Sequence, residues 1–354
     1  MQLDLSRPQP KLSRESPRSV LPGRTVALAE AALRRVGIGL DISTQLHGDV
    51  FWTATADMSF RERLPPNARG LRIAGKGRSE EQCRASCAME LVERYSLFDY
   101  TAQELSEHCC VDLADGAPRI VNRLPDLLDT RCVAAGNTYE EAVLHALEEL
   151  VETRIGRTLP WIPLQLVGVE ALLPELPEWV GRDFVLVRAP TPAPELHHLT
   201  ALRYPADGQF DLQISDHFVK AGGRLLRVPG ARPKNHHSPN SGGAASLDPR
   251  IAAFRAMNEA FQGGPGQVGV GKRRAPPDFV AVAPPTRLHS AATDCVAADV
   301  RRMLQLLGEE VFVGVVDLTH PRLQIPVVRL VSDYDPGVSL TSRHTLRMFF
   351  DLDD

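Results

Sequence analysis

The chain of 354 residues is long enough for one large domain or two ordinary ones. Its hydrophobic fraction of 43%, charged fraction of 24% and net charge of −4 are typical of a soluble globular protein. These values give no reason to expect nucleic acid or a membrane surface as a partner. The polar N-terminus is no secretory signal, no apolar run could span a bilayer, and the six cysteines do not suggest a disulfide framework. We therefore expect a cytoplasmic protein.

Strands and helices alternate along the chain, which predicts a mixed α/β (α+β) fold. Residues 1–24 contain prolines and mixed charges, and we expect them to form an arm before a single domain over 25–354. Helices are predicted at 25–36, around 85–95, at 142–154, at 249–262 and at 297–307. Strands are predicted at 49–55, 71–77, near 133, and at 184–188, 224–228, 311–316 and 326–331.

The string Glu-Leu-Val-Glu occurs twice, at 90–93 and at 149–152, inside two stretches that otherwise indicate buried helix. Helical residues three apart share one face, so each copy places two carboxylates side by side. Burying two ionised carboxylates together is costly without a cation. A short strand and a glycine precede both helices, which suggests an internal strand–Gly–helix duplication. Ser79 is a plausible cap of the first helix and Asn137 of the second.

A third predicted helix has the same design, because Arg255, Glu259 and Gln262 share one face. A meeting of the three helices would gather six carboxylates with arginine and amide side chains. Hard oxygen ligands of this kind suit Mg²⁺, and arginines suit phosphate. The alternative is that each Glu-x-x-Glu is a solvated helix face, which is the usual meaning of one such motif alone.

Five motifs together resemble the YcaO family, in the family's order and at compatible spacing. They are Gly75-Lys76-Gly77, Ser86-x-x-x-Glu90-x-x-Glu93-Arg94, Gly136-Asn137-x-x-x-Glu141-Ala142, Glu149-x-x-Glu152 and Arg255-x-x-x-Glu259-x-x-Gln262. The runs 315–321 and 323–329 are also similar to the family's late strand pair. The chain departs from the pattern at Thr153, where an arginine is usual.

The resemblance implies a YcaO-like fold with an ATP site between helices, and ATP and Mg²⁺ as cofactors. It implies four metal ligands, namely Glu93, Glu141, Glu152 and Glu259. It implies nucleotide contacts from Lys76, Ser86, Glu90, Asn137, Glu149, Arg255 and Gln262, with a further basic residue, Arg18 or Arg24, near the N-terminus. Glu93, Glu152 and Arg255 are the residues that we expect to matter most for catalysis.

The activity implied is activation of a peptide backbone amide by phosphorylation of its oxygen. The chain ends without the proline-rich tail of many azoline-forming members and has little room for a leader-binding domain before residue 25. We therefore expect thioamidation, with an external sulfur donor and a TfuA-like partner. An azoline-forming cyclodehydratase or an amidine macrocyclase with a leader-binding partner is the alternative, and a peptide-presenting scaffold is the non-enzyme reading. Peptide or protein is the expected substrate, and a homodimer is left open.

Other reactive side chains are given structural interpretations. Cys83 and Cys87 share a helix face and are expected to be packed thiols. His197 and His198 are expected to be exposed in a loop, as are the histidines at 236–237. The predicted polar loop at 229–243 precedes the third helix, and its part from 232 onward could close over phosphates or peptide as a lid.

Overall fold

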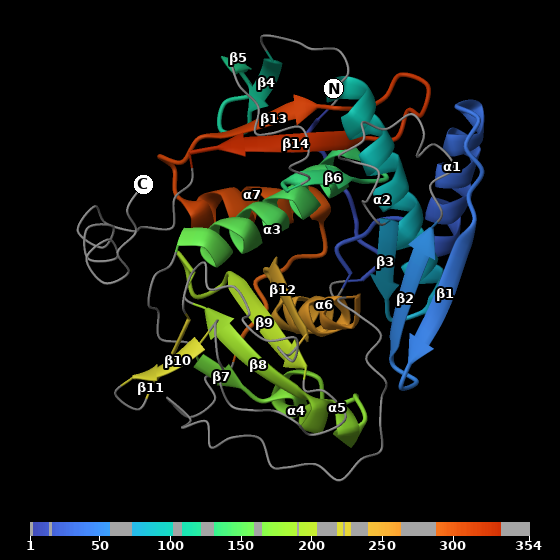
Figure 1. The fold of residues 1–354 in the computed structure, drawn as a ribbon. Coiled ribbons are helices and arrows are strands. Elements are labelled where there is room, and N and C mark those ends of the chain that lie inside the picture. The colour runs from blue at the N-terminus through green and yellow to red at the C-terminus, as the bar shows by residue number, and fades with distance from the viewer. Residues whose placement is uncertain are drawn as a thin grey trace, which may run out of the picture. The chain divides into compact units, whose positions relative to one another are not determined.

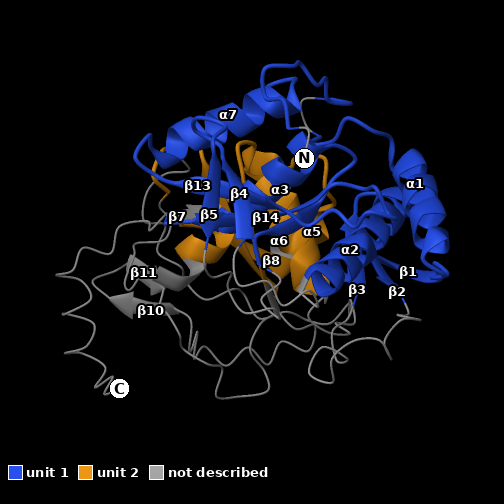
Figure 2. Cartoon of the chain, turned by 90° about the horizontal axis from the view of Figure 1, so that it is seen from above, with its two compact units in different colours: residues 1–150, 291–333 blue, residues 151–290, 334–354 orange. Residues whose placement is uncertain are grey.

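The structure is a computed structural model that describes residues 3–13, 16–56, 73–101, 108–121, 131–158, 165–189, 191–203, 218–221, 224–227, 240–262 and 288–333. Two compact units divide the chain (Figure 2). Unit 1 holds residues 1–150 and 291–333, and unit 2 holds residues 151–290 and 334–354. This division is finer than the single domain expected over 25–354, whose boundary stays a prediction.

Unit 1 begins with helix α1 (Pro22–Arg35) and an antiparallel sheet in the order β1-β2-β3. Its strands are β1 (Ile42–His47), β2 (Phe51–Ala56) and β3 (Ile73–Gly77). Gly48 and Asp49 connect β1 to β2 with positive φ angles of 56° and 61°. The predicted strand at 49–55 therefore corresponds to β2, and sequence reasoning missed β1 because its polar, alternating residues lack a strong apolar signal.

The second sheet of unit 1 is antiparallel throughout, in the order β5-β4-β13-β14-β6. Its strands are β5 (Pro118–Val121), β4 (His108–Asp112), β13 (Val313–Asp317), β14 (Val327–Ser332) and β6 (Val133–Ala135). Three further helices are α2 (Glu80–Thr101), α3 (Tyr139–Thr158), whose last turns belong to unit 2, and α7 (Val296–Leu307). The mixed α/β class is as predicted.

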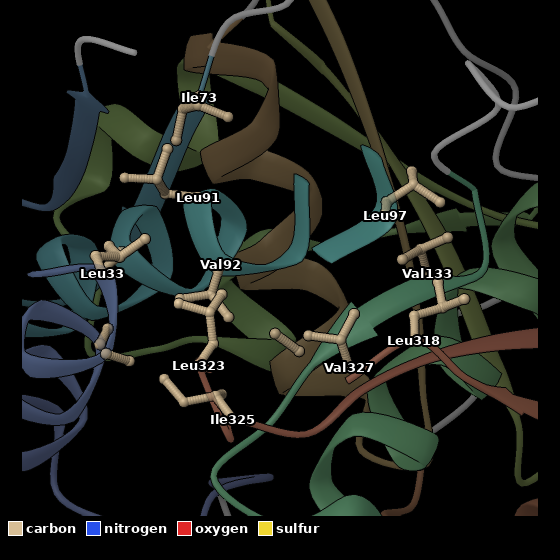
Figure 3. Packing of buried hydrophobic residues seen from close by; sticks show 14 of the residues in the cluster. Leu33, Ile73, Leu91, Val92, Leu97, Val133, Leu318, Leu323, Ile325 and Val327 are labelled. Atoms are coloured by element: carbon tan, nitrogen blue, oxygen red, sulfur yellow. The ribbon is translucent and has the colours of Figure 1, made fainter. Parts of the chain in front are cut away.

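The core of unit 1 forms around α2, most of whose apolar side chains are buried. Leu91 and Val92 are fully buried, and they belong to one hydrophobic cluster with Ile73 of β3 and Leu323 (Figure 3). Leu33 of α1 belongs to the same cluster. Because α2 is enclosed in this way, its carboxylates lie next to apolar surroundings and their charge must be stabilised locally.

Unit 2 contains a four-stranded antiparallel sheet in the order β12-β9-β8-β7, with helix α6 (Pro249–Gln262) packed on β12 and β9. The strands are β7 (Gln165–Val167), β8 (Phe184–Ala189), β9 (His197–Arg203) and β12 (Asn240–Ser246). The smaller elements are helices α4 (Val169–Leu172) and α5 (Glu178–Asp183), and the hairpin of β10 (Phe218–Ala221) and β11 (Arg224–Arg227) (Figure 1).

Two sequence predictions fail in unit 2. His197 and His198 are not exposed in a loop, because both lie in β9 with exposed fractions of 1% and 2%. The predicted polar loop at 229–243 ends early, since Asn240 begins strand β12, which pairs with β9. The rest of that loop and the histidines at 236–237 lie outside the described residues. Both segments belong to strands, β9 and β12, that pair with each other in the sheet of unit 2. A short window of polar residues in the sequence does not indicate this pairing.

None of the helices in the described part of the chain combines the length and the apolar character needed to cross a membrane.

Candidate functional site

Three helices begin in the same way. In each, the side chain of the N-cap residue accepts a hydrogen bond from the backbone N–H three residues later. This bond satisfies one free donor of the helix N-terminus. The pairs are Ser79 with Gln82 in α2, Thr138 with Glu141 in α3 and Asp248 with Ile251 in α6, each at 3.2 Å. Ser79 is the cap that the sequence predicted. Asn137 is not the cap of α3, because Thr138 takes that place one residue later.

The same three helices share a second feature, a glutamate eleven residues after the cap. Each of these carboxylates accepts a hydrogen bond from a backbone N–H in or next to the preceding strand. The pairs are Glu90 with Ala74 at 3.3 Å, Glu149 with Cys132 at 3.1 Å and Glu259 with Gly243 at 2.9 Å. In all three helices this glutamate therefore ties the helix to the strand before it. A common origin of the strand–Gly–helix units stays a prediction.

Glycines allow the strands to approach these helices closely. A Cβ atom at Gly75 would lie 2.3 Å from the carbonyl oxygen of Cys83, and one at Gly242 would lie 2.2 Å from that of Ala256. Both distances are impossible contacts, so any larger residue would push the helix away from the strand. Gly75 and Gly242 are therefore required for the close packing of each strand against its helix.

The middle of α2 holds two carboxylates and one arginine in a buried cluster. Nη2 of Arg94 lies 3.1 Å from Oε1 of Glu90, and its Nη1 lies 3.5 Å from Oε1 of Glu93. Burial, reinforced by the nearby Glu90 charge, raises the pKa of Glu93 to about 8, although Arg94 and the backbone of Ala135 act against the rise. Burial also raises the pKa of Glu90, against Arg94 and Lys76. One arginine does not compensate two buried acids.

Some of the N–H donors of Arg94 make no hydrogen bond to the described residues. Its Nε and Nη1 atoms are buried and make no hydrogen bond among the residues that the structure describes. Burial acts to lower the pKa of Arg94, but the surrounding carboxylates of Glu93, Glu90 and Glu149 outweigh it and raise the value. Glu149 also lies 3.7 Å from Nε2 of His145. Arg94 is therefore a permanent cation with hydrogen-bonding capacity left over.

The start of α3 holds a third buried carboxylate in a different setting. Glu141 is 1% exposed, and its Oε1 accepts hydrogen bonds from the backbone N–H and the hydroxyl of Ser19 at 2.6 and 2.5 Å. Its Oε2 accepts from the backbone N–H and the side chain of Asn137 at 3.1 and 2.9 Å. Burial raises the pKa of Glu141, but the charge of Arg18 at 3.9 Å and these hydrogen bonds lower it overall. Glu141 is thus held as a carboxylate anion.

In unit 2, two more of the predicted residues converge on one backbone position. Gly243 donates its N–H to Glu259, and a Cβ atom built on Gly243 would lie 3.7 Å from Cγ of Glu152. Arg255 lies on the same helix as Glu259, and both are partly buried. The side chain of Gln262 is outside the description. Gly243 therefore brings together the two predicted metal ligands of this unit.

The predicted metal ligands thus fall into two pairs, Glu93 and Glu141 in unit 1 and Glu152 and Glu259 in unit 2. Across the described ranges, no group of three or more His, Cys, Asp or Glu side chains is gathered closely enough to hold a metal ion. In unit 1, Arg94 lies 3.5 Å from Oε1 of Glu93, and Ser19 donates to Oε1 of Glu141. The four-ligand set stays a prediction.

The remaining predicted residues lie on the same elements. Lys76 is half-buried on β3, where its charge lowers the pKa of Glu90, and Ser86 is half-buried on α2. Sequence reasoning missed Ser19, Thr25 and His145. Thr25 donates its hydroxyl to the side-chain oxygen of Asn137 at 3.0 Å. His145 could have been found from the cap, since it lies seven residues after Thr138 as Ser86 and Arg255 do after their caps.

Comparison with known proteins relates the chain to one family. The family model described as "YcaO cyclodehydratase, ATP- and Mg²⁺-binding" matches residues 127–333, more than half of the chain. The chain is similar in structure to YcaO from Methanopyrus kandleri, solved with AMPPCP and Mg²⁺, with 20% identity and a TM-score of 0.62 over 91% of this chain and 93% of that one. It is also similar to a heterocyclase solved in complex with substrate and cofactor, with 18% identity and a TM-score of 0.61 over 94% of this chain. It spans only 54% of that heterocyclase. No curated protein sequence matches the chain.

The matching family is described as one whose members bind a nucleotide together with a divalent cation. The chain belongs to the YcaO family, and its fold is that of YcaO proteins. The family description confirms ATP and Mg²⁺ as the predicted cofactors. The residues fit both groups, because carboxylates are the ligands that Mg²⁺ prefers and the spare donors of Arg94 suit phosphate oxygens.

Proposed function

We propose that the protein uses ATP to activate a backbone amide of a peptide by transferring the γ-phosphoryl group to the amide oxygen. The observation that carries this proposal is the buried group of Glu90, Glu93 and Arg94 on α2, in a chain of an ATP- and Mg²⁺-binding family. Two buried acids that share one arginine favour an added cation, and spare arginine donors favour an added anion. A magnesium nucleotide supplies both.

The residues of the chain divide the work of binding. The metal would be held by Glu93, Glu141, Glu152 and Glu259. Mg²⁺, when bound, neutralises negative charge on the phosphates during transfer. Lys76, Ser86 and Asn137 would contact the nucleotide, together with Glu90, Glu149, Arg255 and Gln262.

Of the two candidates Arg18 and Arg24, we propose that Arg18 contacts the nucleotide. Its Nη1 lies 3.9 Å from Oε2 of Glu141, one of the proposed metal ligands. Arg24 lies exposed in the first turn of α1. A basic side chain already beside Glu141 is close to where the phosphates of a metal-bound nucleotide would bind.

The reaction balances without a protein nucleophile. Hydrosulfide from an external donor adds to the amide carbon, and the electron pair of the C=O bond moves to oxygen. That oxygen attacks the γ-phosphorus of ATP, and ADP leaves. Loss of inorganic phosphate, which carries away the proton of the S–H group, then breaks the C–O bond and forms C=S, so the amide oxygen ends in phosphate and a thioamide remains. The positioned charges of the chain act on the phosphoryl transfer.

A second product is favoured by a specific observation, since the matching family is described as cyclodehydratase. In that case a Cys, Ser or Thr side chain of the peptide attacks in place of sulfide and gives an azoline. An amine in the same role gives an amidine macrocycle. All three products share the phosphorylated intermediate.

The experiment combines the protein with a candidate peptide, ATP, Mg²⁺ and sulfide, and measures the peptide by mass spectrometry. Exchange of oxygen for sulfur increases the mass, whereas azoline or amidine formation loses water. ADP formation that depends on the peptide supports amide activation. No ADP with substrate and a TfuA-like or leader-binding partner present would contradict it and favour the peptide-presenting scaffold. Because ATP is a cytoplasmic substrate, we place the reaction in the cytoplasm.

A further inference from the structure

The N-terminal arm, here residues 3–13 and 16–20, follows a fixed path over unit 1. Pro10 forms a β-bridge with Cys295, and the backbone N–H of Lys11 donates to the carbonyl of Asp294 at 2.9 Å. Lys11 and Asp299 form an ion pair whose side chains are only 1% and 4% exposed. A buried lysine with a hydrogen-bonded partner is a fixed attachment rather than a surface contact.

The carboxylate of Asp299 is prepared for this contact. Its Oδ1 accepts hydrogen bonds from the backbone N–H and hydroxyl of Thr293 at 2.7 and 2.8 Å, which leaves Oδ2 for Lys11. Both oxygens are therefore used. The ion pair anchors the arm to the first turn of α7.

A second anchor attaches the arm to the first turn of α3. The side chain of Gln9 donates to Oε2 of Glu140 at 2.5 Å and accepts from the hydroxyl of Thr138 at 2.9 Å. The backbone N–H of Asp4 donates to Oε1 of the same glutamate at 3.0 Å. Glu140 is 4% exposed. Thr138 is the cap of α3, so the arm contacts the residues next to Asn137 and Glu141.

Beyond these anchors the arm delivers its own side chains to the proposed ligands. The backbone N–H of Leu12 donates to the carbonyl of Arg18 at 2.8 Å, which links the anchored segment to the next one. Ser19 then holds Glu141 through its N–H and its hydroxyl. Thr25, just after the arm, holds Asn137.

We propose that Lys11 and Asp299 are positioning residues for the magnesium–nucleotide site, acting through the arm on Glu141. Their ion pair fixes the path of the arm, and the arm fixes Ser19 and Arg18 against that carboxylate. This inference rests on the proposed function, because it requires Glu141 to bind the cation. Neither Lys11 nor Asp299 belongs to the predicted ligand set.

The test compares Lys11→Met with the wild type in calorimetric titrations with Mg·AMPPCP and in ATPase assays. Loss of an outer contact that orients a ligand weakens binding about tenfold or more, so both the Kd for Mg·AMPPCP and the KM for ATP should rise by about that factor. The kcat at saturating ATP should stay within about twofold, since the catalytic side chains remain present. Lys11→Arg keeps the charge and should recover most of the affinity.

Arg34→Met is the matched control, because it removes an exposed ion pair with Glu30 from the same unit and should leave the Kd unchanged. Limited proteolysis of residues 3–13 reports arm release directly, and it should accelerate in Lys11→Met but not in Arg34→Met. If Lys11→Met does not fold, Gln9→Leu weakens the second anchor and should show the same rise in KM.

Two results would overturn the inference. An arm that is cleaved faster in Lys11→Met while Mg·AMPPCP binds as tightly as in the wild type would show that the arm does not position Glu141. A wild type that does not bind Mg·AMPPCP would overturn the proposed function and this inference with it. Only the first result leaves the proposed function standing.

Discussion

Glu93 and Glu141 are two buried carboxylates of unit 1 that differ in charge state. Glu141, at the start of α3, receives four hydrogen bonds and the charge of Arg18, and its pKa is lowered. Glu93, in the middle of α2, shares Arg94 with Glu90, and burial raises its pKa to about 8. Donors to the ionised form, and not burial alone, decide whether a buried acid is charged.

Because their pKa values are shifted in opposite directions, the two carboxyl groups should bind a cation in different ways. Glu141 is already an anion held in position, so it can meet a cation without first losing a proton. The raised pKa of Glu93 favours its protonated form in the metal-free protein, so we expect a cation that binds it to displace a proton. The region around Glu93 is thus the part of the site that the ligand completes.

The largest expected effect is on ATP turnover. Glu93→Gln and Glu141→Gln each remove one proposed metal ligand and should lower kcat/KM for ATP by about 10³-fold, as loss of a group that stabilises transition-state charge does. Glu152→Gln should do the same from unit 2. Glu81→Gln, an exposed acid in the first turn of α2, is the control. Undiminished turnover in Glu93→Gln and Glu152→Gln would remove the metal-site assignment.

Next in size is the loss of the shared arginine. Arg94→Met leaves Glu90 and Glu93 buried without their arginine and should lower the free energy of unfolding by about 3 kcal/mol in the metal-free protein. Glu93→Gln in the same chain should recover part of that loss. Urea unfolding measures both, and additive losses in the double variant would show that the two residues do not interact.

The pH dependence of stability should have opposite signs at the two acids. The folded pKa of Glu93 is raised, so this group stabilises fully below the unfolded pKa and the contribution is lost as pH rises through about 8. The folded pKa of Glu141 is lowered, so its contribution is present at neutral pH and is lost as pH falls through the folded pKa. Without Mg²⁺, the stability of Glu93→Gln should therefore rise relative to that of the wild type between pH 5 and pH 9. Glu141→Gln should fall behind most at neutral pH. Parallel curves would contradict the contrast.

A buried base in unit 2 offers a smaller effect for comparison. Burial lowers the pKa of His197 to about 4, although its Nε2 contacts the carbonyl of His289 at 2.9 Å. Its contribution to stability is present above the unfolded pKa and is lost as pH falls through about 4. His197→Gln should flatten the acid side of the unfolding curve by about 1 kcal/mol. An unchanged acid side would show that His197 is not buried neutral.

Helix spacing explains how much of the site could be predicted. Glu90 and Glu93 are three residues apart in α2, and this local relation is visible in any sequence window. The helix predicted at about 249–262 is likewise present, as α6. The metal-ligand roles themselves remain predictions that these spacings support.

Contacts between distant segments could not be predicted. Ser19 and Glu141 are 122 residues apart, and nothing in the arm's composition indicates a buried attachment. The strand β12 was partly missed because its glycines are typical of a loop. Its pairing depends on the close approach of α6 to Gly242, which only the folded structure shows.

We propose that Glu93 carries a proton in the metal-free protein and loses it when the cation of a magnesium nucleotide binds. Calorimetric titration of the metal-free protein with Mg·AMPPCP at pH 7, repeated in buffers of different ionisation enthalpy, measures the protons released on binding. The wild type should release about one proton more than Glu93→Gln, because only the wild type has the Glu93 proton to lose. Equal proton release by the two proteins would contradict the claim.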